Sequence, residues 1–278
     1  MKKKRIAAAL LCIAACVLAG MGIREYILEA NAGSSYDHVR TEVEKKETEA
    51  AETEAVSTES PTEVSESSTE GETEKISESE DSNPPEIPID FTALWKENPE
   101  AYAWIRIPGT VIDYPILQSE TDNAYYLNHN IDGEESPEGA IFTEDYNKKD
   151  FTDPNTVLYG HNMKNGSMFQ GLHDYMDRTF FDENREVLIY LPDQILHYEI
   201  FAAYQYDDRH LLLSFDFEDP DVYQKYLDSI FSIRDMNAFV DTTMDVTAED
   251  KILTLSTCYS NYSDDRYLVQ AVLVSIES

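Results

Sequence analysis

The sequence predicts a mostly β domain, a barrel or a sandwich, in the C-terminal two thirds of the chain. Short apolar runs rich in Val, Ile, Tyr and Phe recur at close spacing from residue 86 onward, and turn residues such as Pro108-Gly109 separate them. Helical periodicity is confined to a few short stretches. Many short strands with few helices are typical of β-barrels and β-sandwiches.

The chain begins with a basic and then an apolar segment. Four basic residues precede an apolar run of 18 residues, Ile6 to Ile23. This length just suffices to cross a bilayer and exceeds a usual signal-peptide core of roughly 7–15 residues. We therefore expect residues 1–23 to form a cytoplasmic basic tip and a membrane anchor, with everything after Arg24 outside the cell. A cleaved signal peptide is the alternative, because residues 30–32 read Ala-Asn-Ala.

Residues 24–85 are expected to form a disordered, acidic extracellular stalk. Between Thr41 and Ser82, Glu, Ser and Thr dominate and no aromatic residue occurs. Such a segment cannot bury enough apolar surface to offset its chain entropy, and its like charges extend it. The globular domain then spans residues 86–278. The formal net charge of −34 argues against nucleic acid as a partner.

Each element of the globular domain has a local signal. Asp90 is a plausible N-cap for a short helix that ends near Pro99. Residues 103–117 hold two β-rich runs that Pro108-Gly109 separates, as in a hairpin. Apolar spacing predicts an amphipathic helix at 218–233. Further strands are expected at 139–146, 156–163, 185–191, 195–206, 251–258 and 266–276.

The chain has three cysteines, and only Cys258 lies outside the N-terminal apolar run. Exported proteins usually pair their cysteines, and this domain offers Cys258 no partner. The thiol is therefore either a reactive group or a small buried hydrophobic residue. The cysteine count leaves both interpretations open.

Arg266 lies eight residues after Cys258. If the last two strands pair as an antiparallel hairpin, these two residues lie opposite each other, with Cα atoms about 4.5–5.5 Å apart. A guanidinium beside a thiol favours the thiolate and can hold a developing oxyanion. The alternative is an ordinary strand arginine paired with Asp264 or Asp265.

A nucleophilic thiol also needs a proton donor or acceptor, which histidine can supply. His161 is favoured because it emerges where an apolar strand meets a polar loop, a usual place for functional groups. His197 lies within a predicted strand and is expected to pack, and His129 lies in a turn. The candidates in the domain are His129, His161, His173, His197 and His210.

Several motifs together resemble the sortases, in particular class B. "YGHNM" contains His161, "TLSTC" ends at Cys258, and Arg266 follows at the family's position. "DNAYYL" (122–127), "GAIF" (139–142) and "FTALWKENP" (91–99) extend the resemblance over nearly all of the globular part. The resemblance implies a closed sortase-type β-barrel with a few short peripheral helices, including an N-terminal helix and one inserted before the last strands.

The resemblance also implies a cysteine transpeptidase at the outer face of the membrane. Cys258 would attack a Thr–Gly or Thr–Asn bond in the C-terminal sorting motif of a secreted protein and form a thioester. An amine of a peptidoglycan precursor would then take over the acyl group. His161 would act as acid and base, and Arg266 would hold the substrate carbonyl.

Secondary sites follow from the same resemblance. Asn123, Leu127, Ser256, Thr257 and Tyr259 are expected to contact the substrate, although the alternative for the 122–127 segment is a structural helix. Tyr259 departs from some class members, which carry an acidic residue there. We expect no cofactor and no metal.

Three other functions would account for parts of this pattern. A pilin-polymerising sortase that uses a lysine amine would share the same three residues. A papain-like peptidase would place cysteine before histidine, which is the reverse of the order of His161 and Cys258. A non-enzymatic, membrane-tethered surface protein would tolerate loss of Cys258.

Overall fold

The computed structural model describes residues 36–44, 85–260 and 264–278. The expected anchor, residues 1–23, and most of the expected stalk lie outside the described residues. Within the described part, no helix has both the length and the apolar composition of a membrane span.

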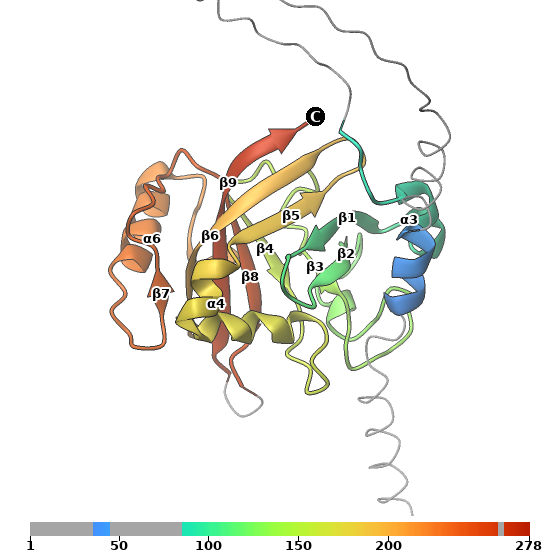
Figure 1. Cartoon of the computed structure of the whole chain (residues 1–278), viewed down its shortest axis with the longest axis horizontal. Helices are drawn as coiled ribbons and strands as arrows, with labels where there is room; N and C mark the ends of the chain where they lie inside the picture. The colour runs from blue at the N-terminus through green and yellow to red at the C-terminus, as the bar shows by residue number, and fades with distance from the viewer. Residues whose placement is uncertain (1–35, 45–84, 261–263) are drawn as a thin grey trace, which may run out of the picture.

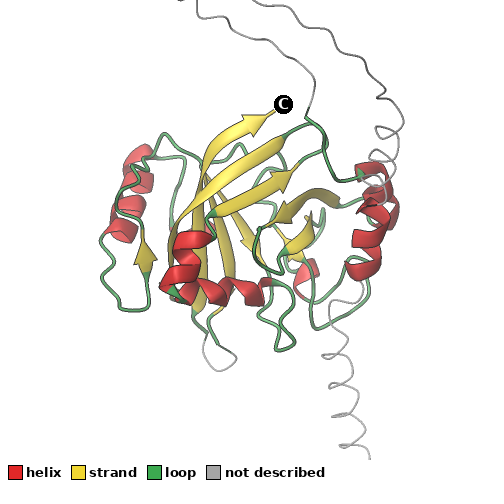
Figure 2. Cartoon of the chain, viewed as in Figure 1, coloured by secondary structure: helices red, strands yellow, loops and turns green. Residues whose placement is uncertain are grey.

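Strands dominate the described part of the chain, and short helices surround them (Figures 1 and 2). The strands are β1 (Ala101–Arg106), β2 (Asp113–Leu117), β3 (Ile141–Phe142), β4 (Asn155–Tyr159), β5 (Glu186–Tyr190), β6 (Ile195–Tyr206), β7 (Phe239–Val240), β8 (Ile252–Cys258) and β9 (Arg266–Glu277). The helices are one at 36–44, α3 (Phe91–Glu97), η1 (Tyr125–Leu127), η2 (Phe169–Met176), α4 (Arg178–Glu183), α5 (Leu211–Ser214) and α6 (Pro220–Phe231).

The strands form one sheet in the order β5-β1-β2-β3-β4-β8-β9-β6-β7. An additional pairing of β5 with β6 joins the two ends of this order, so eight strands close into a barrel and β7 extends it beside β6. Closure removes the open sheet edges that would otherwise invite pairing with other chains. The predicted closed barrel with peripheral helices is confirmed, as are its N-terminal helix α3 and the inserted helix α6.

Two short signals show why the predicted elements formed. The Asp90 carboxylate accepts hydrogen bonds from the backbone N–H groups of Thr92 (2.9 Å) and Ala93 (3.2 Å), which caps α3. Gly109 adopts φ +80° in the turn between β1 and β2, a conformation that residues with a Cβ rarely adopt.

A buried polar network fixes β8 against the inserted helix α6. The Gln270 amide donates to the hydroxyl groups of Tyr226 (2.7 Å) and Thr254 (2.9 Å). Its carbonyl accepts from Tyr204 (3.0 Å), and Thr254 in turn donates to Asn155 (2.8 Å). Buried polar groups need hydrogen-bond partners, and these partners meet in only one register of β4, β8 and β9. The network therefore stabilises this register.

Residues 36–44 correct the predicted stalk. They form a helix that lies beside α3 (Figure 1), and its Tyr36, Val39 and Val43 side chains are buried. The prediction of a disordered segment over 24–85 was therefore wrong for these nine residues. Apolar residues at i, i+3 and i+7 give a helix one buried face, and the Glu-rich sequence that begins at Thr41 obscured this short pattern.

Candidate active site

Two strand pairings bring the candidate residues together. β4 and β8 run parallel, with Tyr159 paired to Ser256. His161 lies two residues after Tyr159, and Cys258 lies two residues after Ser256. Since the two strands run in the same direction, both residues lie at the same edge of the barrel. In the antiparallel pairing of β8 with β9, Cys258 lies opposite Arg266. The predicted opposition of the thiol and the guanidinium is confirmed.

These three side chains line one cavity of about 170 Å³ at the carboxyl ends of β4 and β8. Cys258 is partly exposed there and is the described residues' free cysteine. The cavity walls come from the last residue of η1, from β3, from the ends of β4, β8 and β6, from the loop that leads into α5, and from the start of β9. The other lining residues are Leu127, Phe142, Tyr159, Gly160, Tyr206, Asp208, Arg209, His210, Leu211, Ser256, Thr257 and Leu268.

Hydrogen bonds orient the imidazole of His161 and the guanidinium of Arg266, and another holds the backbone of Cys258. His161 Nε2 donates to the backbone carbonyl of Leu127 (2.6 Å), which fixes the imidazole against the η1 segment. The Arg266 guanidinium donates to the carbonyl of Asp264 (2.5 Å). The Asn162 amide donates to the Cys258 carbonyl (3.2 Å) and ties the loop after β4 to the end of β8.

Comparison with known proteins decides the family. Residues 105–274 match the model of the Sortase domain. The chain belongs to the sortase family, in its class B. It is 34% identical over 192 residues to Sortase B of Listeria monocytogenes, an alignment that covers 68% of this chain and 76% of that protein. It is 32% identical over 190 residues to Sortase B of Staphylococcus aureus, over 67% of this chain and 75% of that protein.

Solved structures of class B sortases have the same fold. The X-ray structure of Clostridium perfringens sortase B superposes with a TM-score of 0.61 at 34% identity, over 67% of this chain and all of that one. The crystal structure of Staphylococcus aureus sortase B gives 0.58 at 31% identity, over 66% and 86% of the two chains. As a member of this class, the protein is an enzyme of the sortase type, a cysteine transpeptidase for cell-wall anchoring.

Of the five residues expected to contact the substrate of this class B sortase, three line the cavity and two do not. Leu127, Ser256 and Thr257 line the cavity, and half of the Leu127 surface is exposed. Asn123 and Tyr259 are not among the lining residues. Asn123 exchanges two hydrogen bonds with Asp145 instead. The ring of Tyr259 packs near Tyr267 instead, with 6.4 Å between the ring centroids.

Sequence reasoning missed a second polar group in the sortase cavity. His210 Nε2 lies 2.7 Å from Glu144 Oε2, and the Tyr159 hydroxyl donates to the same carboxylate oxygen (3.1 Å). Burial raises the pKa of Tyr159, and the nearby Glu144 charge raises it further, so this hydroxyl keeps its proton as a donor. His210 precedes α5 and Glu144 follows β3, a long-range pairing that no local motif signals.

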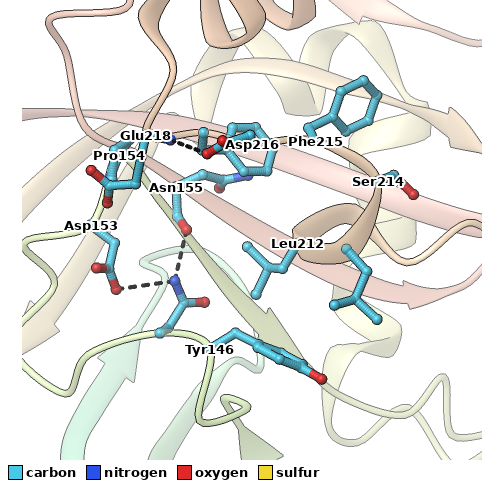
Figure 3. Close-up of a pocket in the computed structure, with 12 residues that line it drawn as sticks. Tyr146, Asp153, Pro154, Asn155, Leu212, Ser214, Phe215, Asp216 and Glu218 are labelled. Carbon is cyan, nitrogen blue, oxygen red and sulfur yellow. Dashed lines mark hydrogen bonds between the residues drawn. The ribbon is translucent and has the colours of Figure 1, made fainter.

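A second, larger hollow of about 420 Å³ lies between the loop after β3 on one side and α5 with the segment after it on the other (Figure 3). Asp153 and Glu218 lie toward one end and Ser214 toward the other, with Tyr146 and Leu212 facing each other between them. The ring of His210 contacts Tyr146, so His210 stands between this hollow and the cavity that holds Cys258.

Metal-ligating side chains gather elsewhere on this sortase. Among the described residues, the ligand atoms of His38, Glu97 and Asp132 lie within 4.8 Å of one another, and all three residues are exposed. They come from the 36–44 helix, α3 and the loop after η1, and none of them lines the Cys258 cavity.

Proposed function

We propose that this sortase cleaves a C-terminal sorting motif on secreted proteins and transfers them to an amine of a peptidoglycan precursor. One observation carries the proposal. His161, Cys258 and Arg266, which come from three separate stretches of the sequence, line the same cavity at one edge of the barrel. A thiol, an imidazole and a guanidinium can supply the nucleophile, the acid and base, and the oxyanion stabilisation for acyl transfer through a thioester.

In the first step the Cys258 sulfur attacks the carbonyl carbon of the scissile peptide bond as a thiolate. The carbonyl oxygen becomes an oxyanion, which the Arg266 guanidinium stabilises by charge and hydrogen bonding. The carbon–nitrogen bond then breaks, and the departing amine takes a proton from His161. Since Nε2 donates to the Leu127 carbonyl, Nδ1 is the nitrogen that exchanges the proton.

In the second step the acceptor amine attacks the thioester carbonyl. His161 removes a proton from the amine, the carbon–sulfur bond breaks, and Cys258 is restored as the thiolate. The product is a new peptide bond between the secreted protein and the acceptor. The cavity segments contributed by Leu127, Ser256 and Thr257 hold the sorting motif during both steps.

The proposed location follows from the sequence. Residues 1–23 hold the enzyme in the membrane, with the N-terminus in the cytoplasm and the barrel outside. This placement supports the proposal because both substrates, a secreted protein and a cell-wall precursor, are present on that side. The basic residues before Ile6 and the length of the apolar run support this orientation.

Intact-mass spectrometry tests the proposal directly. The full chain in detergent is incubated with a panel of sorting-motif peptides that vary around the Pro and Thr positions. We expect a mass increase equal to the N-terminal peptide fragment, with loss of the C-terminal fragment. Adding amine acceptors, a lysine side chain and a peptidoglycan cross-bridge among them, should discharge the adduct and identify the preferred acceptor.

Two variants serve as controls for this measurement. Cys258→Ala should form no adduct, because it lacks the nucleophile, and His161→Ala should nearly abolish the adduct. An adduct that persists in Cys258→Ala would place the acyl group on another residue. Complete absence of an adduct with every peptide, although Cys258 is readily alkylated, would argue for a different substrate.

A further inference from the structure

The 36–44 helix lies against the segments that hold His161. Tyr36 is fully buried, and its hydroxyl donates to the backbone carbonyl of Gly139 (2.6 Å). We propose that Tyr36 is a positioning residue for His161, through two separate sets of contacts. The inference rests on the role proposed for His161 above. It assigns a role to a residue that lies before the globular domain predicted from the sequence, residues 86–278.

The first set of contacts runs through the η1 segment to the imidazole. Gly139 has φ +53°, and a Cβ there would lie 2.5 Å from the carbonyl oxygen of Tyr126 and 2.7 Å from that of Leu127. The N–H of the residue after Gly139 donates to the Tyr126 carbonyl (2.9 Å). The next carbonyl along, that of Leu127, accepts from His161 Nε2. Displacement of Gly139 therefore moves the acceptor that orients the imidazole.

The second set of contacts runs to the backbone of His161. The ring of Tyr36 packs edge-on against Tyr114, with 5.4 Å between the centroids. The Tyr114 hydroxyl accepts from the backbone N–H of Met168 (3.0 Å), and the next residue, Phe169, donates its N–H to the His161 carbonyl (3.0 Å). Met168 has φ +57°, a strained conformation that its surroundings must hold in place.

Arg40, one turn after Tyr36, strengthens the contact between the helix and the barrel. Its guanidinium lies 4.6 Å from the centroid of the Tyr114 ring and donates to the Asp113 carbonyl (2.8 Å). Burial raises the pKa of the Tyr36 hydroxyl, and the charge of Glu138 raises it further. The hydroxyl thus remains a proton donor to Gly139 at any working pH.

The expected consequence is a loss of alignment of His161 that is larger than any loss of substrate contacts. Tyr36 is absent from the residues that line the cavity, and its path to His161 uses a backbone carbonyl of Leu127, so a change at Tyr36 should affect proton transfer more than ground-state binding. A general acid and base displaced by a fraction of an ångström transfers protons less well. We therefore expect a change at Tyr36 to lower kcat more than it changes KM.

The test compares Tyr36→Phe with Val43→Ala in the full chain. Tyr36→Phe removes only the hydroxyl, whereas Val43→Ala weakens packing at the opposite end of the same helix. With the peptide identified by mass spectrometry, we expect Tyr36→Phe to lower kcat about threefold to tenfold, with KM changed less than twofold. Val43→Ala should lower thermal stability and leave kcat within twofold of the wild type.

A spectroscopic readout makes the test independent of turnover. The chain has six histidines, so ¹⁵N-labelled histidine gives few signals, and the His161 ring is assigned with His161→Gln. Tyr36→Phe should shift the His161 ring nitrogens, and Val43→Ala should not. Unchanged ring signals in Tyr36→Phe, or equal changes in both variants, would overturn the positioning role. Absence of turnover in the wild type would count against the proposed function, and the ring signals would still decide the role of Tyr36.

Discussion

Arg266 reaches the cavity from the first position of β9, directly across from Cys258. Its guanidinium donates to the Asp264 carbonyl, so one edge of this planar group is held by the backbone in the cavity that Cys258 also lines. A lysine at this position would keep the positive charge. It would lose the forked donors that can hold a backbone carbonyl and an oxyanion together.

We therefore expect Arg266→Lys to lose most transpeptidation. The loss in kcat/KM should be about 10²-fold or more, as for removal of a single oxyanion donor elsewhere. The measurement is steady-state release of the C-terminal peptide fragment. Turnover equal to that of the wild type in the lysine variant would remove Arg266 from the proposed mechanism.

Arg209 offers a matched control, because it is a second guanidinium in the lining of the same cavity. Its side chain pairs with Asp207 (2.8 Å) in an exposed position, and such pairs contribute little. Arg209→Lys should therefore retain activity within about twofold of the wild type, well below the loss in Arg266→Lys.

At the scale of elements, α6 depends on its N-cap residue, Asp219. The Asp219 carboxylate accepts from the N–H groups of Asp221 (2.9 Å) and Val222 (3.4 Å), and Pro220 occupies the first helical position. This arrangement satisfies backbone donors that the helix itself leaves unpaired. The helix in turn buries Tyr226 beside the polar network behind the site.

Asp219→Ala should lower the free energy of unfolding by about 1 kcal/mol, within the range of 0.5–2 kcal/mol for lost N-caps. Asp219→Asn retains an acceptor oxygen and should lose only a small part of this. Urea denaturation of both variants provides the measurement. Equal losses in the two variants would show that the negative charge, rather than the cap, stabilises the helix.

Helices and strands with a sequence signal of their own were predicted, whereas those that depend on pairing with a distant segment were not. α3 and α6 carry caps and periodicity within a dozen residues, and both were predicted close to their observed bounds. β8 and β9 were predicted with their pairing, which placed Cys258 opposite Arg266. β7 has two residues, and its pairing with β6 depends on a register far away in the sequence, so no local pattern indicates it.

The site was predictable to a similar extent. Cys258 and His161 stand at strand ends, where position alone suggests a function. The contact between His210 and Glu144 joins two loops that are distant in the sequence, and only the closed barrel brings them together. Tyr36 and its neighbours were missed because the Glu-rich sequence from Thr41 obscures their short apolar pattern, and because their partners on the barrel are distant in the sequence.

At the scale of the whole molecule, Asp241 joins parts that are far apart in the chain. Its carboxylate accepts from Thr243 (2.6 Å) and pairs with Arg185 before β5 (2.6 Å). The Thr243 hydroxyl, followed by Arg185, lowers the pKa of Asp241 from its ordinary value of 3.8 to about 2. At pH values between these two pKa values, the Asp241 carboxylate binds a proton in the unfolded chain but not in the folded protein.

The contribution of Asp241 to the free energy of unfolding is therefore fully present above about pH 4, and it is lost as the pH falls toward about 2. Asp241→Asn should be less stable than the wild type at pH 7. Its free energy of unfolding should also fall less steeply between about pH 5 and pH 2. Chemical denaturation at a series of pH values measures both. Parallel curves for the two proteins would show that the carboxylate does not titrate in the folded state as described.

The packed helix at 36–44 also limits how far the barrel could lie from the membrane anchor that we propose for residues 1–23. Because residues 44 and 85 both belong to parts held on the same barrel, the stretch between them adds nothing to the distance from the membrane. Only residues 24–35 can separate the barrel from an anchor that ends at residue 23. Twelve residues span at most roughly 40 Å, whereas the 62 residues of a continuous stalk would span roughly 200 Å. With the proposed anchor, the barrel would therefore work within a thin layer above the bilayer, close to newly exported chains and membrane-bound precursors.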